Sequence, residues 1–131
     1  MTPRLIANAV VVLHFAFILW ATFGALTLFR HRSLAWVHVP ALAWAAYIEF
    51  AGRICPLTPL ENEFRRLAGS AGYGGGFIQH YILSVIYPAG LTRNLQIVLG
   101  VCLVACNALI YLIVFARGAP RARIRSRRRL P

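Results

Sequence analysis

The stretch Leu5–Phe29, LIANAVVVLHFAFILWATFGALTLF, contains 25 consecutive residues without Asp, Glu, Lys or Arg. As an α-helix, which rises about 1.5 Å per residue, it extends roughly 37 Å. That length crosses the hydrocarbon core of a bilayer, which is about 30 Å thick, with room for some tilt. The stretch is also longer than the apolar core of a signal peptide, and no convincing cleavage site follows it. The sequence therefore predicts a first transmembrane helix that remains in the protein.

Two further apolar stretches predict two more membrane spans. Residues 34–53 follow a short basic turn at residues 30–32 and carry Glu49 near their far end. Pro40 falls in the second turn of this stretch, where its missing N–H predicts a kink or a loosened first turn. The last stretch, residues 95–116, is bounded by arginine on both sides. With the first stretch, these give spans of about 5–29, 34–53 and 95–116.

The overall composition agrees with three spans. Hydrophobic residues make up 60% of the 131 residues and the mean hydropathy is +0.67, more than a soluble domain of this size can bury. Three cysteines, an odd number, do not indicate a disulfide framework. We therefore expect an all-α membrane protein whose residues 1–116 form a three-span membrane domain. The basic tail, residues 117–131, holds seven of the fourteen arginines.

The positions of the arginines also predict the orientation. Cytoplasmic loops are enriched in Lys and Arg, and three spans place the 30–32 turn and the tail on the same side of the membrane. A fourth span over residues 77–87 would separate them, and eleven residues extend only about 16 Å, roughly half of the hydrocarbon core. We therefore expect a periplasmic N-terminus, a periplasmic segment 54–94 and a cytoplasmic C-terminus.

Segment 54–94 predicts two short amphipathic helices on the periplasmic face. The sequence TPLE at 58–61 has the residues of a capping box, with Thr58 as the N-cap and Glu61 three residues later. In the helix that follows, Glu61 is spaced to pair with Arg65 on the polar face. After a glycine-rich connector, apolar residues recur every four positions over residues 77–87. We expect the apolar face of this second helix to lie on the bilayer.

Three short sequences in this part of the chain are distinctive: CPLTPLE at 55–61, GGFIQHY at 75–81 and IYP at 86–88. Together with the spans, they resemble a bacterial family of small integral membrane proteins, the domain-of-unknown-function 2784 family. The resemblance covers roughly residues 5–116 and does not include the tail. It implies a multi-pass protein of the bacterial inner membrane with this architecture, and it implies no activity.

One polar side chain from each span falls at the same depth in the membrane. His14, Glu49 and Cys102 lie 15, 15 and 14 residues from the predicted cytoplasmic ends of their spans at residues 29, 34 and 116. Ionisable groups inside a span are costly to insert, so each needs a function or a partner. One hypothesis is a buried site in which Glu49 orients or protonates His14, as a proton relay, a metal ligand pair or a quinone contact.

The competing interpretation of these groups is structural. Arg53 follows Glu49 by one turn and can pair with it, leaving only a hydrogen bond between helices. Cys102 is a weak third candidate for a metal ligand together with His14 and Glu49, because zinc usually takes four ligands. In an apolar helix, Cys also behaves as a small hydrophobe that favours close packing. The sequence leaves both interpretations open.

Two further polar residues within the spans are expected to be structural. Asn107 can hydrogen-bond another helix, with small residues around it that allow close approach. His38 lies near the inner end of the second span, and we expect it at the cytoplasmic interface beside Trp36.

The tail predicts an electrostatic contact. Its run of like charges without hydrophobic periodicity is typical of a disordered segment that binds anionic lipid headgroups. Ribosomal RNA or an acidic partner subunit is the alternative, and nothing indicates sequence-specific binding of nucleic acid. The predicted lipid-binding residues are Arg121, Arg123, Arg125, Arg127, Arg128 and Arg129.

We therefore predict a small non-catalytic protein of the inner membrane, serving as an accessory or assembly subunit of a larger membrane complex. Enzymatic activity has little support, because the sequence shows no set of nucleophile, base and orienting group and no cofactor-binding loop. The alternative is an intramembrane protein that binds a ligand or handles electrons or protons through His14 and Glu49. The sequence names no cofactor for that alternative.

Overall fold

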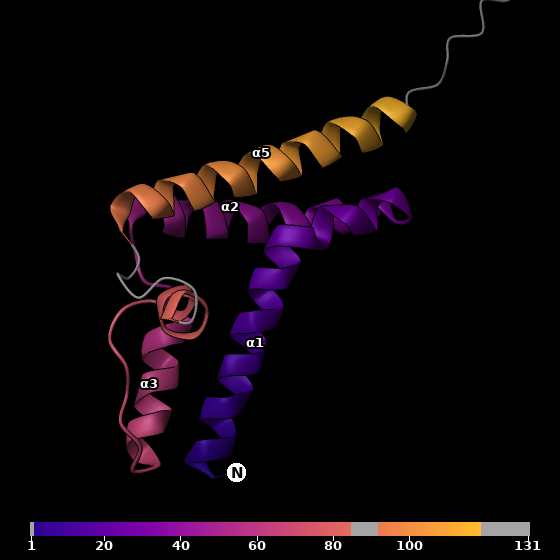
Figure 1. Cartoon of the computed structure of the whole chain (residues 1–131). Coiled ribbons are helices and arrows are strands. Elements are labelled where there is room, and N and C mark those ends of the chain that lie inside the picture. The colour runs from indigo at the N-terminus through magenta and orange to yellow at the C-terminus, as the bar shows by residue number, and fades with distance from the viewer. Residues whose placement is uncertain (1, 85–91, 119–131) are drawn as a thin grey trace, which may run out of the picture.

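The computed structural model describes residues 2–84 and 92–118 and is helical throughout those two ranges apart from short connections. Figure 1 shows α2 and α5 side by side, with α1 running away from them at a steep angle and α3 beside the N-terminal half of α1. The long helices are α1 (Pro3–Phe23), α2 (Ala35–Ala51) and α5 (Arg93–Gly118), and α3 is Leu57–Leu67. The shorter elements are the 3-10 turns η1 (Gly24–Phe29) and η2 (Arg32–Leu34) and the π-helical segment η3 (Ile78–Leu83).

Three of these helical stretches are long and apolar enough to cross a membrane. They are Pro3–Phe29, Arg32–Ala51 and Arg93–Arg117. In the first stretch, the α-helix α1 ends at Phe23 and the 3-10 helix η1 continues the apolar segment to Phe29. The predicted fold class, an all-α membrane protein with three spanning helices, is confirmed.

The second span ends at a glycine. Gly52 adopts the left-handed conformation, with φ 62° and ψ 33°, and the Gly52 and Arg53 amides donate to the carbonyls of Glu49 and Ile48. Such a left-handed residue terminates a helix without the steric cost that a Cβ would bring. Arg93, at the start of α5, donates to the carbonyls of Glu49 and Phe50 and so joins the end of α2 to α5.

The main apolar core lies at the opposite end of this helix pair. Ala25 and Leu28 of η1 and Val114 of α5 are buried there, packed against the start of α2. Arg32 donates to the Val114 carbonyl at 3.0 Å and ties the turn before α2 to the last turns of α5. Three segments distant in the sequence therefore meet at one end of the molecule.

His38 is buried within the protein and is not exposed beside Trp36. Its side chain is fully buried, its Nδ1 lies 2.9 Å from the Tyr111 hydroxyl, and the edge of the Trp20 ring packs against it. Trp36, in contrast, is 87% exposed. Gly24 leaves room for the imidazole ring between α2 and η1, so His38 faces the protein interior, and its depth in the membrane stays a prediction.

The first amphipathic helix starts differently from the prediction. It begins at Leu57 with Pro56 as its N-cap residue, and no side chain caps it. Thr58 is buried rather than at the cap, and Glu61 lies on the buried side of α3. The predicted capping box was therefore wrong, because the glutamate binds partners from the following segment.

The helix predicted over residues 77–87 is present as Phe77 and η3, and its residues 85–87 lie outside the described ranges. Phe77 is buried, with its ring centroid 4.1 Å from that of His14 on α1. At Phe77, the apolar face packs on the protein rather than on the bilayer. The expectation for the bilayer contact was wrong at this residue because His14 supplies a flat partner for its ring.

Candidate functional site

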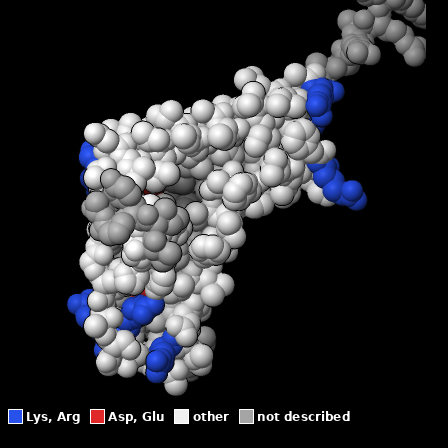
Figure 2. All heavy atoms as spheres, in the orientation of Figure 1, with Lys and Arg blue, Asp and Glu red and all other residues white. Residues whose placement is uncertain are grey.

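A cavity of about 650 Å³ lies where α1 diverges from α2 and α5. Figure 2 shows the molecule hollowed at this junction. Phe77 and η3 line another side of the cavity, part of which remains open to the surroundings. Besides the polar groups described below, the walls include Phe17, Ile18, Ala21, Ala45, Ile48, Ile78, Ile82, Leu83, Leu99, Cys102, Leu103 and Cys106. The cavity therefore has the predominantly apolar lining that is typical of a small-molecule site.

Three polar side chains in this apolar wall carry buried atoms without a hydrogen-bond partner in the described part of the chain. They are His14 Nδ1, Glu49 Oε2 and Asn107 Oδ1. The three residues come from α1, α2 and α5 respectively. The structure thus brings the two predicted site residues, His14 and Glu49, to one cavity together with Asn107.

His14 is only 3% exposed and belongs to the wall that α1 contributes. Its ring packs on Phe77, and Glu61 of α3 is close enough to act on it electrostatically. Within residues 2–84 and 92–118, the structure contains no hydrogen bond between His14 and Glu49. His14 and Glu49, which the sequence places at the same depth, therefore line the same cavity, but no hydrogen bond links them within those ranges.

Glu49 does not pair with Arg53 as the sequence suggested. The left-handed turn at Gly52 takes Arg53 off the helix, so the two side chains are no longer on successive turns of one face. Among the described residues, both ion pairs that the structure contains lie within α3. Arg53 is exposed and lines the cavity. Glu49 also lines the cavity, and one of its carboxyl oxygens is buried.

Asn107 is fully buried and lies where α1 crosses α5. Its amide nitrogen donates to the carbonyls of Ala21 at 3.3 Å, Thr22 at 3.4 Å and Leu103 at 2.8 Å. The first two bonds join the end of α1 to α5, which is the contact between helices expected for this residue. Among the described residues its amide oxygen is buried and has no hydrogen-bond partner, and Asn107 is one of the residues that line the cavity.

Cys102 and Cys106 also line the cavity as free thiols. No group of three or more His, Cys, Asp or Glu side chains that could hold a metal ion occurs within residues 2–84 and 92–118. Cys102 therefore reaches the same cavity as His14 and Glu49 without completing a metal site with them in this structure.

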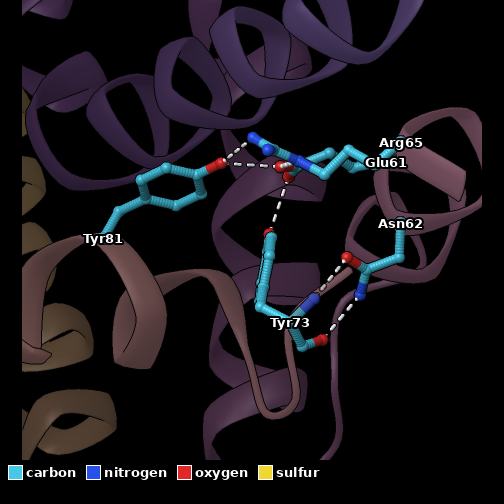
Figure 3. Close-up of polar contacts among 5 residues, drawn as sticks. All are labelled: Glu61, Asn62, Arg65, Tyr73 and Tyr81. Atoms are coloured by element: carbon cyan, nitrogen blue, oxygen red, sulfur yellow. Dashed lines mark hydrogen bonds and ion pairs between the residues drawn. The ribbon is translucent and has the colours of Figure 1, made fainter. Parts of the chain in front are cut away.

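The wall formed by Phe77 and η3 is held by a polar cluster centred on Glu61. The Glu61 carboxylate is 0% exposed and forms an ion pair with Arg65, with 2.8 Å between Oε1 and Nε. It also accepts hydrogen bonds from the hydroxyls of Tyr73 and Tyr81, both at 2.7 Å. Figure 3 shows the two tyrosines converging on this carboxylate from outside α3. One buried charge thus holds α3, the glycine-rich connector and η3 together.

Two further contacts fix the connector at Tyr73. Asn62 accepts from the Tyr73 amide at 3.0 Å and donates to its carbonyl at 2.8 Å, as Figure 3 shows. The Tyr73 ring stacks on His80, with ring centroids 3.8 Å apart. Asn62 therefore fixes the backbone of the connector at Tyr73, and His80 packs against the Tyr73 side chain.

The Glu61 cluster favours neutral tyrosines. Burial together with the bond to the Glu61 carboxylate raises the pKa of Tyr81 to about 12. The same causes raise the pKa of Tyr73 further. Both hydroxyls therefore remain protonated donors at neutral pH.

The sequence predicted the ion pair between Glu61 and Arg65 but missed the tyrosines. Tyr73 and Tyr81 lie 12 and 20 residues beyond Glu61. Helical spacing gives no signal at such separations. One feature of the sequence could have indicated the contact: Glu61 and Tyr81 belong to the distinctive sequences at 55–61 and 75–81.

The predicted lipid-binding arginines of the tail, residues 121–129, lie outside the described ranges. The last described basic residue is Arg117 of α5, whose guanidinium lies 6.0 Å from the centroid of the Phe29 ring. Arg117 therefore lies at the same end of the molecule as the turn that follows Phe29.

The chain was compared with protein families, curated proteins and solved structures. Residues 4–112 match the model of a family described as "Protein of Unknown function (DUF2784)". No curated protein and no solved structure matches the chain. The match covers both the helices that form the cavity and the Glu61 cluster.

Proposed function

Because the chain belongs to the DUF2784 family, whose description names no activity, we propose its function from the cavity: it binds a small membrane-soluble molecule between its helices. The proposal is for a non-catalytic binding protein. It corresponds to the ligand-binding alternative, with His14 and Glu49 as two of the contacts. Asn107 is the third contact.

The observation that carries the proposal concerns the six buried polar side-chain atoms that lack a hydrogen-bond partner among the described residues: three of them belong to residues that line one apolar cavity, His14, Glu49 and Asn107. Leaving a buried polar group unsatisfied costs about 1–3 kcal/mol. Three such groups from three helices would therefore cost several kcal/mol together unless an occupant satisfies them. A bound molecule or ordered water supplies those bonds, and a cavity of about 650 Å³ exceeds what a few waters need.

Filling the cavity tests this proposal. Leu103→Trp adds bulk at the cavity wall and should reduce any small molecule that co-purifies in mild detergent at least tenfold. Leu109→Trp is the matched control, because Leu109 lies on the same helix, is 59% exposed and does not line the cavity. Mass spectrometry of organic extracts measures the difference. Equal recovery from both variants would contradict binding in this cavity.

We also propose the orientation expected from the sequence, with the N-terminus periplasmic and the C-terminus cytoplasmic in a bacterial inner membrane. Supporting it, the contacts of Arg32 with Val114 and of Arg117 with Phe29 gather basic side chains at one end of the spanning helices. Positive charge at that end favours the cytoplasmic side. The connection from Gly52 to Thr92 then faces the periplasm, and its apolar residues Leu60 and Leu67, which are exposed on α3, can rest on the membrane surface.

Reporter fusions test the orientation. A reporter that is active only in the periplasm should be inactive when fused after Pro131 and active when inserted at Gly74. Gly74 is a suitable insertion site because a side chain added there would meet open space. Activity at the C-terminus, or silence at Gly74, would reverse or exclude the proposed topology.

A second candidate function is the one predicted first, an accessory or assembly subunit. It is favoured by the outer surface of α2, where large apolar side chains such as Trp36, Val37 and Trp44 remain exposed. Partner helices or lipid can cover such a surface. Stoichiometric protein partners that co-purify through this surface, and are lost when it is made polar, would support the subunit function.

The tail remains a proposed contact with anionic lipid headgroups. Each arginine near such a surface contributes about 1 kcal/mol before screening by salt.

A further inference from the structure

The chemistry of the cavity is most restricted at Asn107. Within the described residues, its amide nitrogen has three partners, the backbone carbonyls of Ala21, Thr22 and Leu103, and carbonyls only accept hydrogen bonds. The amide orientation is therefore fixed, with the NH₂ group facing the carbonyls and the oxygen left over. An amide oxygen can only accept. An occupant that satisfies this position must donate a hydrogen bond.

Asn107 lies at the crossing of α1 and α5 and is one of the residues that line the cavity. It binds the end of α1, and α1 and α5 separate from that crossing. His14 precedes Ala21 by seven residues, and Gly100, which packs against Glu49, precedes Asn107 by seven. Seven residues of helix correspond to about 10 Å. His14 and Glu49 therefore line the cavity about two helical turns away from Asn107, so an occupant can place a polar head at Asn107 and an apolar body beyond it.

The surroundings of Asn107 favour an uncharged head. The residues of the cavity wall nearest to it in α1 and α5 are Ala21, Thr22, Leu103 and Cys106, none of which carries a formal charge. Thr22 already donates to the Ile18 carbonyl at 2.8 Å. A charged head at this depth would have no counter-ion within the neighbouring turns, and a lone charge in the membrane interior is costly. The charged residues among the described lining, Glu49 and Arg53, come from the end of α2 and from the turn that follows it.

From these contacts, and resting on the proposed function, we propose that the cavity takes an uncharged amphiphile whose hydroxyl group donates to Asn107 Oδ1. Its apolar body lies between Phe17 and Ile18 of α1 and Leu99 and Cys102 of α5. A long-chain alcohol and an alkylated hydroquinone both present such a hydroxyl.

Matched pairs of probes test the hydroxyl directly on the unsubstituted full chain in a nonionic detergent. Dodecanol is compared with dodecyl methyl ether, and a decyl-substituted hydroquinone with its dimethyl ether. Each ether keeps the oxygen and the apolar body but donates no hydrogen bond. Losing one hydrogen bond to a buried acceptor should weaken binding roughly tenfold. Dissociation constants can be measured by native mass spectrometry or thermal shift. The pair whose hydroxyl compound binds more tightly identifies whether an alkyl alcohol or a hydroquinone fits the cavity better.

Two variants assign the preference to Asn107. Asn107→Leu should remove the discrimination between alcohol and ether, and Leu109→Trp should retain it because Leu109 is exposed on the same helix and does not line the cavity. If Asn107→Leu fails to fold, the comparison of probes on the unsubstituted protein still decides the question.

Equal affinity for alcohol and ether would overturn the hydroxyl proposal and leave ligand binding in the cavity intact. Failure of all four probes would also overturn it, and a co-purified molecule that Leu103→Trp removes would then show that the proposed function holds with a different ligand. If no probe binds and no co-purified molecule is removed by Leu103→Trp, both the hydroxyl proposal and the proposed function are overturned.

Discussion

Replacing Glu61 with Ala is expected to destabilise the α3 end of the molecule by about 3 kcal/mol, the lower end of the range for a broken buried ion pair. The substitution removes the acceptor of Arg65, Tyr73 and Tyr81 at once. We take the lower end because Arg65 is 27% exposed and can regain water. Thermal unfolding in detergent measures the loss. Hydrogen exchange should locate it in α3 and in residues 73–84.

Glu63→Ala is the matched control for this prediction. Glu63 is also a glutamate of α3 paired with an arginine, Arg66, but both side chains of that pair are more than half exposed. Exposed pairs contribute about 0–1 kcal/mol, so this variant should unfold almost as the unsubstituted protein does. Equal destabilisation by the two variants would mean that the buried cluster does not hold α3 and η3 together.

Gly24→Ala is expected to destabilise the opposite end of the molecule by about 1–3 kcal/mol, as overpacking of a filled core does. Gly24 has an ordinary helical backbone, with φ −59° and ψ −29°, so alanine is conformationally allowed there. The added methyl group would instead collide with the buried His38 ring and lie 3.1 Å from Trp20. The imidazole would have to move away from the Tyr111 hydroxyl.

The control for Gly24 is Gly76→Ala. A Cβ at Gly76 meets no atom within 4 Å, so its effect should stay within about 0.5 kcal/mol. Thermal unfolding of the two variants under identical conditions checks the prediction. A Gly24→Ala protein as stable as the control would show that His38 is not held in the tight packing described here.

The spans could be predicted from the sequence because their signal is local. An uninterrupted apolar stretch of about 20 residues has few alternatives to a helix of membrane-spanning length. The apolar character of the spans also explains why the packing angle between the helices could not be predicted. Apolar residues surround these helices on all sides, so the pattern did not indicate that α1 leaves α2 and α5 at a steep angle.

The candidate site was predictable in part. Counting residues from the span ends brought His14, Glu49 and Cys102 to one depth, and the structure places all three on one cavity. Counting could not predict that His14 packs on Phe77 or that a left-handed Gly52 separates Glu49 from Arg53. Those outcomes depend on helix rotation and on a local backbone conformation rather than on depth.

The Glu61 cluster could not be predicted because its partners are distant in the sequence. Polar residues on an amphipathic helix normally face solvent, and α3 departs from this arrangement at Glu61 while Glu63 and Arg66 remain exposed. It buries Glu61 and leaves Leu60 and Leu67 exposed. Burial of Glu61 is favourable because Arg65, Tyr73 and Tyr81 all donate to the carboxylate.

The central claim is that the cavity between α1, α2 and α5 holds a small molecule. Its most direct test is an experimental structure of the full chain in a lipid nanodisc, at a resolution that separates bound ligand from water. The account predicts continuous non-protein density in the cavity, with one end within hydrogen-bond distance of Asn107 Oδ1 and the body passing toward His14 and Glu49. A cavity filled only by separate waters, or closed by movement of α1 onto α5, would contradict it.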